Sequence, residues 1–241
     1  MGNQKRKWNC EFHPLGENGV VIKLGNQINL DIFQLVQTLS RYLEDHPFPG
    51  FIEQVPAFTS VTVYYDTYFY FQQGHSFPFE KVCKVITSML DFIKDDGQAV
   101  SRNVEIPVCY GGEFGPDLLE VAEYNRLSPE EVIAIHSGGE YSVYTIGFAP
   151  GFPYLGGMSN EIASPRKNSP RLKIPAGSVG IAGTQTGIYP METPGGWQLI
   201  GRTPIELFRP YEKIPSFLRA GDQIRFIPIS PLEYELMKES D

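Results

Sequence analysis

The spacing of apolar residues at the start of the chain predicts two strands followed by a helix. Short apolar runs at residues 12–15 and 20–24 are separated by a segment that ends in Asn18-Gly19. An Asn-Gly pair favours the tight turn of a β-hairpin because both residues tolerate positive φ angles. Asn29 can then cap a helix whose apolar residues recur at the helical period. The prolines within residues 46–50 end this helix, since proline cannot continue one.

A similar order of elements follows. Two strand-like runs, residues 51–58 and 61–71, precede a helix that begins at Pro78 and keeps apolar residues on one face. The order ββαββα predicts an antiparallel sheet covered by helices. Residues 94–98 form a polar stretch typical of a linker. We therefore expect an N-terminal α+β domain at residues 1–97 and a second domain at residues 98–241.

The second region begins with a predicted strand at residues 104–110 and two short helices within residues 118–135. The second helix is well marked, because Ser128 and Glu131 form a capping box and Pro129 occupies the first helical position. Short apolar runs then alternate with Gly- and Pro-containing turns to the end of the chain. These runs lie at residues 141–146, 177–182, 187–189, 197–200, 204–208 and 223–229. Many short strands joined by such turns favour a β-barrel or sandwich.

Composition narrows the function classes. The formal net charge of -8 argues against binding to nucleic acid or to an anionic membrane surface, which needs a basic footprint. The N-terminus leads into no apolar stretch, and no run is long enough for a membrane-spanning helix. Cys10, Cys83 and Cys109 are odd in number and widely spaced, which is typical of reduced thiols in a cytoplasmic protein.

The motifs of several enzyme classes do not occur in the sequence. The glycine stretches at residues 111–115 and 180–187 lack the Lys-Ser/Thr ending of a P-loop, so tight turns explain them better. The two helices within residues 118–135 could be taken for a helix-turn-helix, but the second contains no Lys or Arg. No nucleophile elbow is present, and no catalytic residue can be assigned.

The histidines are few and scattered. His13, His46, His75 and His136 have no metal-ligand spacing, so we expect no metal site. His136 differs from the others because it falls in the last turn of a predicted helix, where the helix dipole would favour an imidazolium. Two interpretations stay open for it: a side chain that caps the helix, and one that contacts a pocket.

One segment, residues 147–158, interleaves aromatic residues with Gly and Pro. It predicts a rigid loop that presents Phe148, Phe152 and Tyr154 to a cavity. Residues 164–173 follow with four cations in an otherwise acidic protein. Arg166 and Arg171 could form a bidentate clamp for a carboxylate or a phosphate, or they could balance nearby acidic residues on the surface.

Four sequence phrases together resemble the KipI family, which is also described as the B subunit of 5-oxoprolinase, or as allophanate hydrolase subunit 1 and the matching part of urea carboxylase carboxyltransferase domains. The phrases lie at residues 106–117, 147–158, 169–179 and 193–201, and shorter matches occur at residues 47–53 and 56–60. The resemblance covers nearly the whole chain. It implies an α+β protein in which a small N-terminal α/β sandwich domain precedes a C-terminal cyclophilin-like β-barrel domain.

In function the resemblance implies the B subunit of an ATP-dependent 5-oxoprolinase, which opens 5-oxoproline to glutamate together with A and C subunits. The alternatives are an inhibitor of a sporulation sensor histidine kinase and a subunit related to allophanate hydrolase or urea carboxylase. Because the chain shows no nucleotide motif and no clear nucleophile, we expect ATP to be used by the complex, with no cofactor bound by this chain. The residues expected to line a shared substrate site are Arg166, Arg171, Phe148, Phe152, Tyr154, Gln185, Tyr189, Trp197 and His136.

Overall fold

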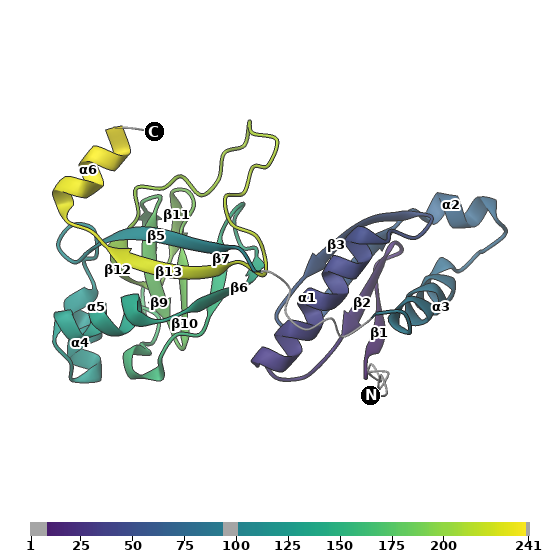
Figure 1. Ribbon diagram of the computed structural model, residues 1–241, viewed down its shortest axis with the longest axis horizontal. Coiled ribbons are helices and arrows are strands. Elements are labelled where there is room, and N and C mark those ends of the chain that lie inside the picture. The colour runs from purple at the N-terminus through teal and green to yellow at the C-terminus, as the bar shows by residue number, and fades with distance from the viewer. Residues whose placement is uncertain (1–8, 94–100, 240–241) are drawn as a thin grey trace, which may run out of the picture. The chain divides into compact units, whose positions relative to one another are not determined.

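The computed structural model describes residues 9–93 and 101–239. The chain divides into two compact units, Met1–Val100 and Ser101–Asp241 (Figure 1). The predicted linker at residues 94–98 lies outside the described residues.

The first unit is a four-stranded antiparallel sheet with helices. Its strands are ordered β1-β2-β4-β3. The elements in chain order are β1 (Glu11–Leu15), β2 (Gly19–Lys23), α1 (Leu30–Asp45), β3 (Phe51–Pro56), β4 (Ser60–Tyr65), α2 (Thr67–Gln72) and α3 (Pro78–Leu90). The predicted hairpin is confirmed, although the positive φ of its turn falls at Gly16.

The core of this unit joins one face of the sheet to α1 and α3. Asn29 begins α1 as predicted, because its side-chain oxygen accepts a hydrogen bond from the Ile32 N–H at 2.9 Å. The buried apolar side chains of α1, α3, β2 and β4 belong to a single cluster, so both helices cover the same face. Its fully buried members are Val20, Ile22, Val36, Leu39, Leu43, Val61, Val63, Val82 and Ile86.

The predicted strand at residues 61–71 is wrong beyond Tyr65. Asp66 ends the strand and caps α2, because its carboxylate accepts hydrogen bonds from the backbone N–H groups of Tyr68 at 2.9 Å and Phe69 at 3.2 Å. The aromatic run of α2 favours a strand by propensity alone. The aspartate cap favours a helix, and in this segment the cap outweighs the propensity.

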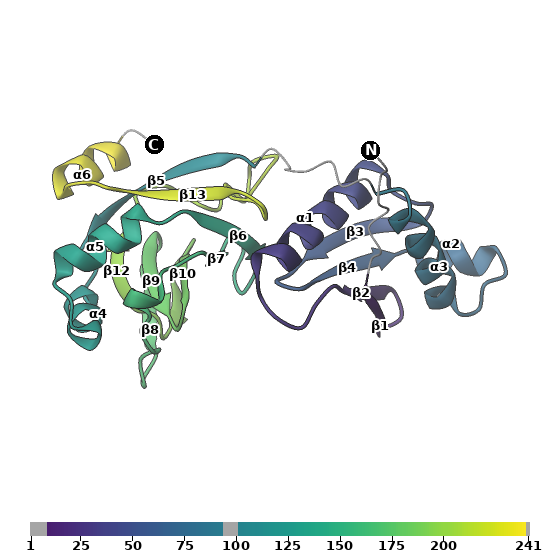
Figure 2. The ribbon, with the colours of Figure 1, turned by 60° about the horizontal axis from the view of Figure 1, so that its bottom comes forward.

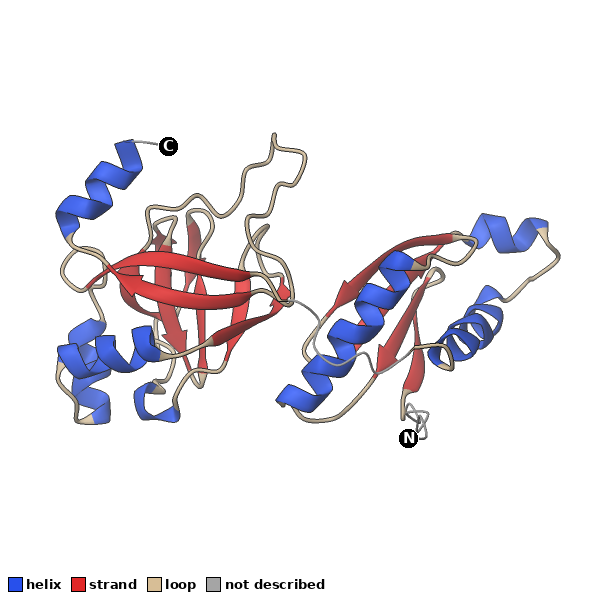
Figure 3. Cartoon of the chain, in the orientation of Figure 1, coloured by secondary structure: helices blue, strands red, loops and turns tan. Residues whose placement is uncertain are grey.

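The second unit is a closed barrel with strand order β10-β7-β6-β13-β5-β12-β9 (Figure 3). Its strands and helices are β5 (Asn103–Tyr110), α4 (Leu118–Asn125), α5 (Pro129–Gly138), β6 (Tyr141–Ile146), β7 (Pro153–Gly156), η1 (Asn160–Ile162), β8 (Arg171–Ile174), β9 (Ser178–Ala182), β10 (Gln185–Ile188), β11 (Thr193–Gly195), β12 (Gln198–Arg202), β13 (Gln223–Pro228) and α6 (Pro231–Glu239). The pair β13–β5 is parallel. The predicted α+β class with a C-terminal barrel is confirmed.

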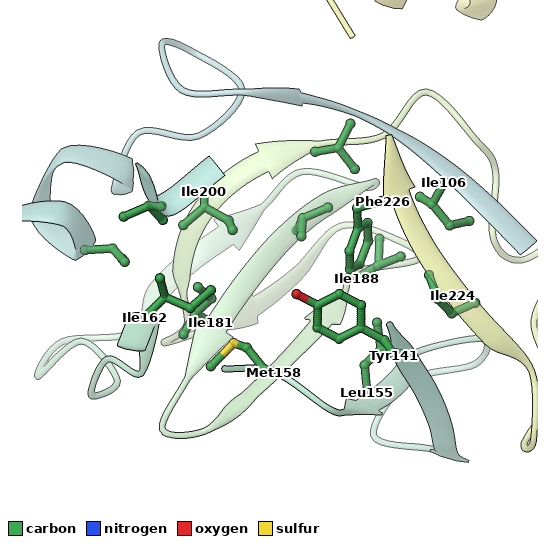
Figure 4. Close-up of a cluster of buried hydrophobic side chains, with 14 of the residues drawn as sticks. Ile106, Tyr141, Leu155, Met158, Ile162, Ile181, Ile188, Ile200, Ile224 and Phe226 are labelled. Atoms are coloured by element: carbon green, nitrogen blue, oxygen red, sulfur yellow. The ribbon is translucent and has the colours of Figure 1, made fainter. Parts of the chain in front are cut away.

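Aliphatic side chains fill the barrel interior, together with Tyr141 and Phe226 (Figure 4). The helices α4 and α5 contact each other, and each also contacts a barrel strand (Figure 2). The predicted capping box of α5 is confirmed. The Ser128 hydroxyl accepts from the Glu131 N–H at 3.2 Å, and the Glu131 carboxylate accepts from the Ser128 N–H at 2.7 Å.

Two predictions of local structure need correction in the barrel. Residues 204–208 are not a strand, and only an isolated bridge joins Phe208 to Ser216. Pro204 lacks the N–H that a ladder needs. The segment predicted as a rigid loop, residues 147–158, is not a loop throughout, because residues 153–156 form β7, which pairs with β6 and β10. Pro153 stands at the first position of β7, where a strand tolerates proline.

Candidate functional site

A cluster of aromatic side chains lies beside β7, β10 and β12. Phe152, Tyr189 and Trp197 are buried, and Tyr154 is half-buried against them. The cluster is separate from the core of the barrel interior. It joins side chains that are up to 45 positions apart in the chain, so the closure of the barrel assembles it.

Gly187 provides the space for two of these rings. Its neighbours on β10, Thr186 and Ile188, are fully buried in the barrel, so the alternation of a strand places Gly187 on the outer face. A Cβ at this position would lie 3.0 Å from Cζ of Phe152 and 3.1 Å from Cζ3 of Trp197. Any larger residue would push the rings off the strand.

The rings of the cluster meet edge to face, the arrangement that aromatic quadrupoles favour. Ring centroids are 5.5 Å apart for Phe152 and Trp197, at an interplanar angle of 90°. Phe152 lies 5.2 Å from Tyr189 and 4.9 Å from Tyr154. Phe148 adds a fifth ring, 5.4 Å from Phe152, but its side chain is exposed. The structure thus brings five of the predicted site residues together.

Tyr189 is a poor base in this environment. Burial raises the pKa of its hydroxyl to about 12, although the charges of Arg166 and Arg171 act in the opposite direction. The phenol is therefore protonated near neutral pH, and it can take part in hydrogen bonding but not in proton abstraction.

Arg166 lies over the Trp197 ring, with its guanidinium carbon 5.9 Å from the ring centroid. Its side chain is exposed, and it makes no ion pair within the described part of the chain. A guanidinium stacked on a ring keeps its N–H groups at the edge, where they can donate to an incoming anion.

Arg171 forms an ion pair with a buried carboxylate of the protein. Its Nη2 donates to Oδ1 of Asp117 at 2.6 Å, and its Nη1 is buried without a hydrogen-bond partner among the described residues. The two arginines of the predicted clamp therefore lie in different environments, and Arg171 balances an acidic residue, as the alternative interpretation expected. Arg166 faces solvent, and Arg171 is anchored.

Asp117 is the anchor, and the sequence patterns did not single it out. Its buried carboxylate accepts hydrogen bonds from Arg171, from Lys167 Nζ at 2.9 Å and from the backbone N–H of Leu199 at 2.7 Å. Burial alone would raise the pKa of Asp117, but these donors lower it overall. Lys167 also donates to Glu120 at 2.6 Å.

The signal for this network was weak in the sequence. Asp117 and Arg171 are separated by 54 positions, and although they lie in the phrases 106–117 and 169–179, nothing in either phrase pairs the two residues. A Gly-Pro-Asp turn at the start of a helix is typical of an ordinary helix cap. Yet Asp117 makes no side-chain capping bond, which frees its carboxylate for the cations.

His136 lies inside the barrel, away from the aromatic cluster. Its Nε2 is 3.0 Å from the Thr186 hydroxyl and its Nδ1 is 2.8 Å from the Tyr110 hydroxyl. Because Thr186 donates its only hydroxyl hydrogen to the Gly180 carbonyl, it must accept from His136 Nε2–H. Nδ1 then accepts from Tyr110.

The helix dipole does not keep His136 protonated. Burial lowers the pKa of His136 to about 3, so the ring is neutral, and desolvation outweighs the helix dipole. The ring does not cap α5 either, since both nitrogens bind side chains of β5 and β10.

The remaining predictions concern Gln185, metals and membranes. Gln185 begins β10, is half-buried and pairs with Ala182 in the β9–β10 hairpin. In the described ranges no group of three or more His, Cys, Asp or Glu side chains is placed to hold a metal ion. No helix among the described residues is long and apolar enough to cross a membrane. All three cysteines are free thiols.

Comparison with known proteins identifies the class. A family model described as the carboxyltransferase domain, subdomain C and D, matches residues 10–218. The chain is 57% identical over 232 residues to the 5-oxoprolinase B subunit of Bacillus subtilis, covering 95% of this chain and 97% of that protein. It is 41% identical over 217 residues to the 5-oxoprolinase B subunit of Escherichia coli O157:H7, covering 89% and 94%.

A solved structure agrees with the fold. The crystal structure of TTHA0988 matches with a TM-score of 0.74 at 34% identity, over 88% of this chain and 40% of that chain. This chain therefore spans two-fifths of the length of that structure. The family model, which matches most of the chain, places the protein in the class of carboxyltransferase-type domain proteins. Within that class, the chain belongs to the family of 5-oxoprolinase B subunits, as its motifs indicated.

Proposed function

We propose that this protein is the B subunit of an ATP-dependent 5-oxoprolinase and acts only with its A and C partner subunits. The observation that carries the proposal is the 57% identity to a 5-oxoprolinase B subunit over 95% of the chain. The sequence has no P-loop, so the nucleotide is expected on a partner. The complex would open the lactam of 5-oxoproline to give glutamate.

This chain would supply recognition. The substrate 5-oxoproline is a compact five-membered ring that carries one carboxylate. Arg166 would offer an exposed guanidinium to that carboxylate at the edge of the aromatic cluster. A charge-assisted hydrogen bond of this kind contributes about 1.5–3 kcal/mol. Gln185 stays a proposed contact at the end of β10.

Arg171 would act indirectly. Its ion pair with Asp117 fixes β8 near α4, and its charge adds to the positive potential around Tyr189. In this role Arg171 and Asp117 are positioning residues. They hold the segment that carries Arg166 against the barrel.

The chemistry itself must come from elsewhere. Lactam opening coupled to ATP needs an activated nucleophile and a general acid or base near its working pH. Tyr189 is protonated, and His136 is neutral but sealed inside the barrel. Neither can serve as a base for a substrate on the outer face. The partners would supply these groups, with this chain forming one wall of a shared site.

One of the rival functions would use the same face of the barrel. A subunit of the carboxyltransferase type, as in urea carboxylase, is consistent with the family model, which is described as a carboxyltransferase domain. Such a subunit would handle a carboxyl group and a urea-type amide, for which the same cation and aromatic surface would serve. Inhibition of a sporulation kinase is supported by the motif resemblance only.

Omission experiments test the proposal. Glutamate release from 5-oxoproline would be measured with this protein, ATP and the A and C subunits of the same host, leaving out one component at a time. Turnover that requires every component is the expected result. Turnover without this chain would reject the proposal, and so would ATP-dependent turnover of urea by the complete mixture in place of 5-oxoproline.

A further inference from the structure

Phe148 adopts a backbone conformation that disfavours any side chain. Its φ is 69°, and only one other non-glycine residue of the described ranges has a positive φ. The Ala149 N–H donates to the Gly147 carbonyl at 2.9 Å, so Phe148 is the central residue of a γ-turn. With a positive φ at its centre, this turn is rare and strained, and glycine is the residue that it suits.

The second residue with positive φ has an evident structural reason. Arg126, at φ 60°, ends α4 in the left-handed conformation that many helices use to terminate. The Leu127 N–H then closes the helix end by donating to the Ala122 carbonyl at 2.9 Å. Phe148 lies at no helix end, so this explanation does not apply to it.

The loop around Phe148 is held tightly. The Gly147 N–H donates to the Phe152 carbonyl at 3.0 Å, and the Phe152 N–H donates to the Ala149 carbonyl at 3.0 Å. These bonds close the loop whatever side chain stands at position 148. A turn of this shape needs no aromatic ring.

The ring of Phe148 nevertheless stands over the aromatic cluster. It is 65% exposed, with its centroid 5.4 Å from Phe152 and 6.5 Å from Tyr189. Arg166 borders the same cluster through Trp197, and its charge also acts on Tyr189. An exposed ring and an exposed guanidinium thus border the same buried cluster. Strained residues of this kind concentrate at ligand sites, where the surrounding structure maintains them.

We infer that Phe148 is a ligand-binding residue whose ring covers the apolar side of a small carboxylate held by Arg166. The inference rests on the proposed function and deepens it, since it names a cyclic monocarboxylate as the ligand class. In this arrangement the carboxylate meets the guanidinium, and the ring of the ligand lies on the exposed side of the Phe148 ring, whose other side packs on the cluster. The strained turn keeps Phe148 in place before the ligand arrives.

Two substitutions separate the ring from the strain. Phe148→Ala removes the ring and keeps the strained backbone, whereas Phe148→Gly removes both. Both variants should raise KM for 5-oxoproline in the reconstituted complex by about tenfold, the equivalent of one aromatic contact. Phe148→Gly should melt at a higher temperature than Phe148→Ala. Arg126→Gly is the matched control, which should also raise the melting temperature but leave KM unchanged.

The outcomes distinguish this inference from the proposed function. If the wild-type complex turns over and both Phe148 variants keep the wild-type KM, Phe148 is a packing residue and the inference is wrong. If the variants fail to co-elute with the partner subunits in size-exclusion chromatography, the ring belongs to a subunit interface, which also overturns it. If the wild-type complex releases no glutamate, the proposed function fails first. In that case, calorimetry would compare the affinity for 5-oxoproline of the wild-type complex with that of the Phe148 variants. Equal affinities would contradict the inference about Phe148.

Discussion

The two units of the molecule bury polar side chains to very different extents. Among the described residues of the N-terminal unit, Ser40 is the one buried polar side chain. The barrel buries eight, including the charged Asp117 and Asp222 and the neutral His136. The core of the first unit is thus almost entirely apolar. The barrel combines an apolar interior with polar networks at its strand and helix junctions.

The buried polar groups of the barrel join distant segments. Asp117 links α4 to β8 and β12, and His136 links α5 to β5 and β10. Arg102, just before β5, binds Asp222 beside β13. Burying such groups costs desolvation free energy, but their bonds determine which segments pack together. A site assembled from several strands depends on that specific packing. The comparison teaches that buried polar contacts define how the barrel is assembled, and the barrel is the unit that carries the proposed substrate face.

Asp117→Asn should give the largest effect on stability. It removes the charge that compensates Arg171 and Lys167, so we expect a loss of about 3 kcal/mol in the free energy of unfolding. Glu192→Gln, which alters an exposed pair with Lys173, is the control and should change it by less than about 0.5 kcal/mol. Chemical denaturation of both variants measures the difference. Equal effects would mean that the polar network of the barrel contributes no more than a surface pair.

The pH dependence of Asp117 follows from the same network. Because the folded-state pKa lies below the unfolded value, its contribution is present above the unfolded pKa and is lost as the pH falls through the folded pKa. We expect this contribution to the free energy of unfolding to be lost below about pH 4.

His136 should produce a second, separate pH dependence. Its folded-state pKa of about 3 lies below the usual value for histidine, so the unfolded chain binds the extra proton first. The free energy of unfolding should therefore fall as the pH drops from about 6.5, by up to about 1.4 kcal/mol per pH unit. In His136→Gln this slope should flatten between about pH 6.5 and 4.5. An unchanged slope would show that another group titrates there.

Paired serine substitutions give the smallest expected effect and compare the two units directly. The Ser40 hydroxyl is buried without a hydrogen-bond partner in the described structure, so Ser40→Ala should be neutral or slightly stabilising. The Ser164 hydroxyl accepts from Asn125 at 3.1 Å and donates to the Ile162 carbonyl at 3.4 Å. Ser164→Ala should cost about 1 kcal/mol in thermal unfolding measurements. A larger loss of stability for Ser40→Ala than for Ser164→Ala would contradict the difference drawn between the two units.

Local signals in the sequence predicted much of the fold. The hairpin near Gly16, the cap at Asn29 and the capping box at Ser128 all depend on a few neighbouring residues, and all are confirmed. The strand expected at residues 61–71 failed because β-propensity was weighed above the helix cap at Asp66. Residues 204–208 failed because an apolar run does not reveal whether a partner strand is available.

The candidate site was only partly predictable. An unusual run of aromatic residues and a cluster of cations pointed to Phe152 and Arg166 without any knowledge of distances. The burial of His136 and the role of Asp117 depend on contacts with residues 50 or more positions away. Desolvation and ion pairing act through space, so a linear pattern does not record them. The strained turn at Phe148 is likewise a property of φ, visible only in the fold.

The most direct test of the account is the effect of Arg166 on substrate affinity. KM for 5-oxoproline would be measured in the reconstituted complex for Arg166→Ala, Arg166→Lys and the control Lys173→Ala, which removes an exposed cation paired with Glu192. Loss of a charge-assisted bond predicts a rise in KM of about 10- to 100-fold for Arg166→Ala. Arg166→Lys should recover part of it, and the control should match the wild type. An unchanged KM for Arg166→Ala in an assembled, active complex would contradict the claim that this face recognises the substrate.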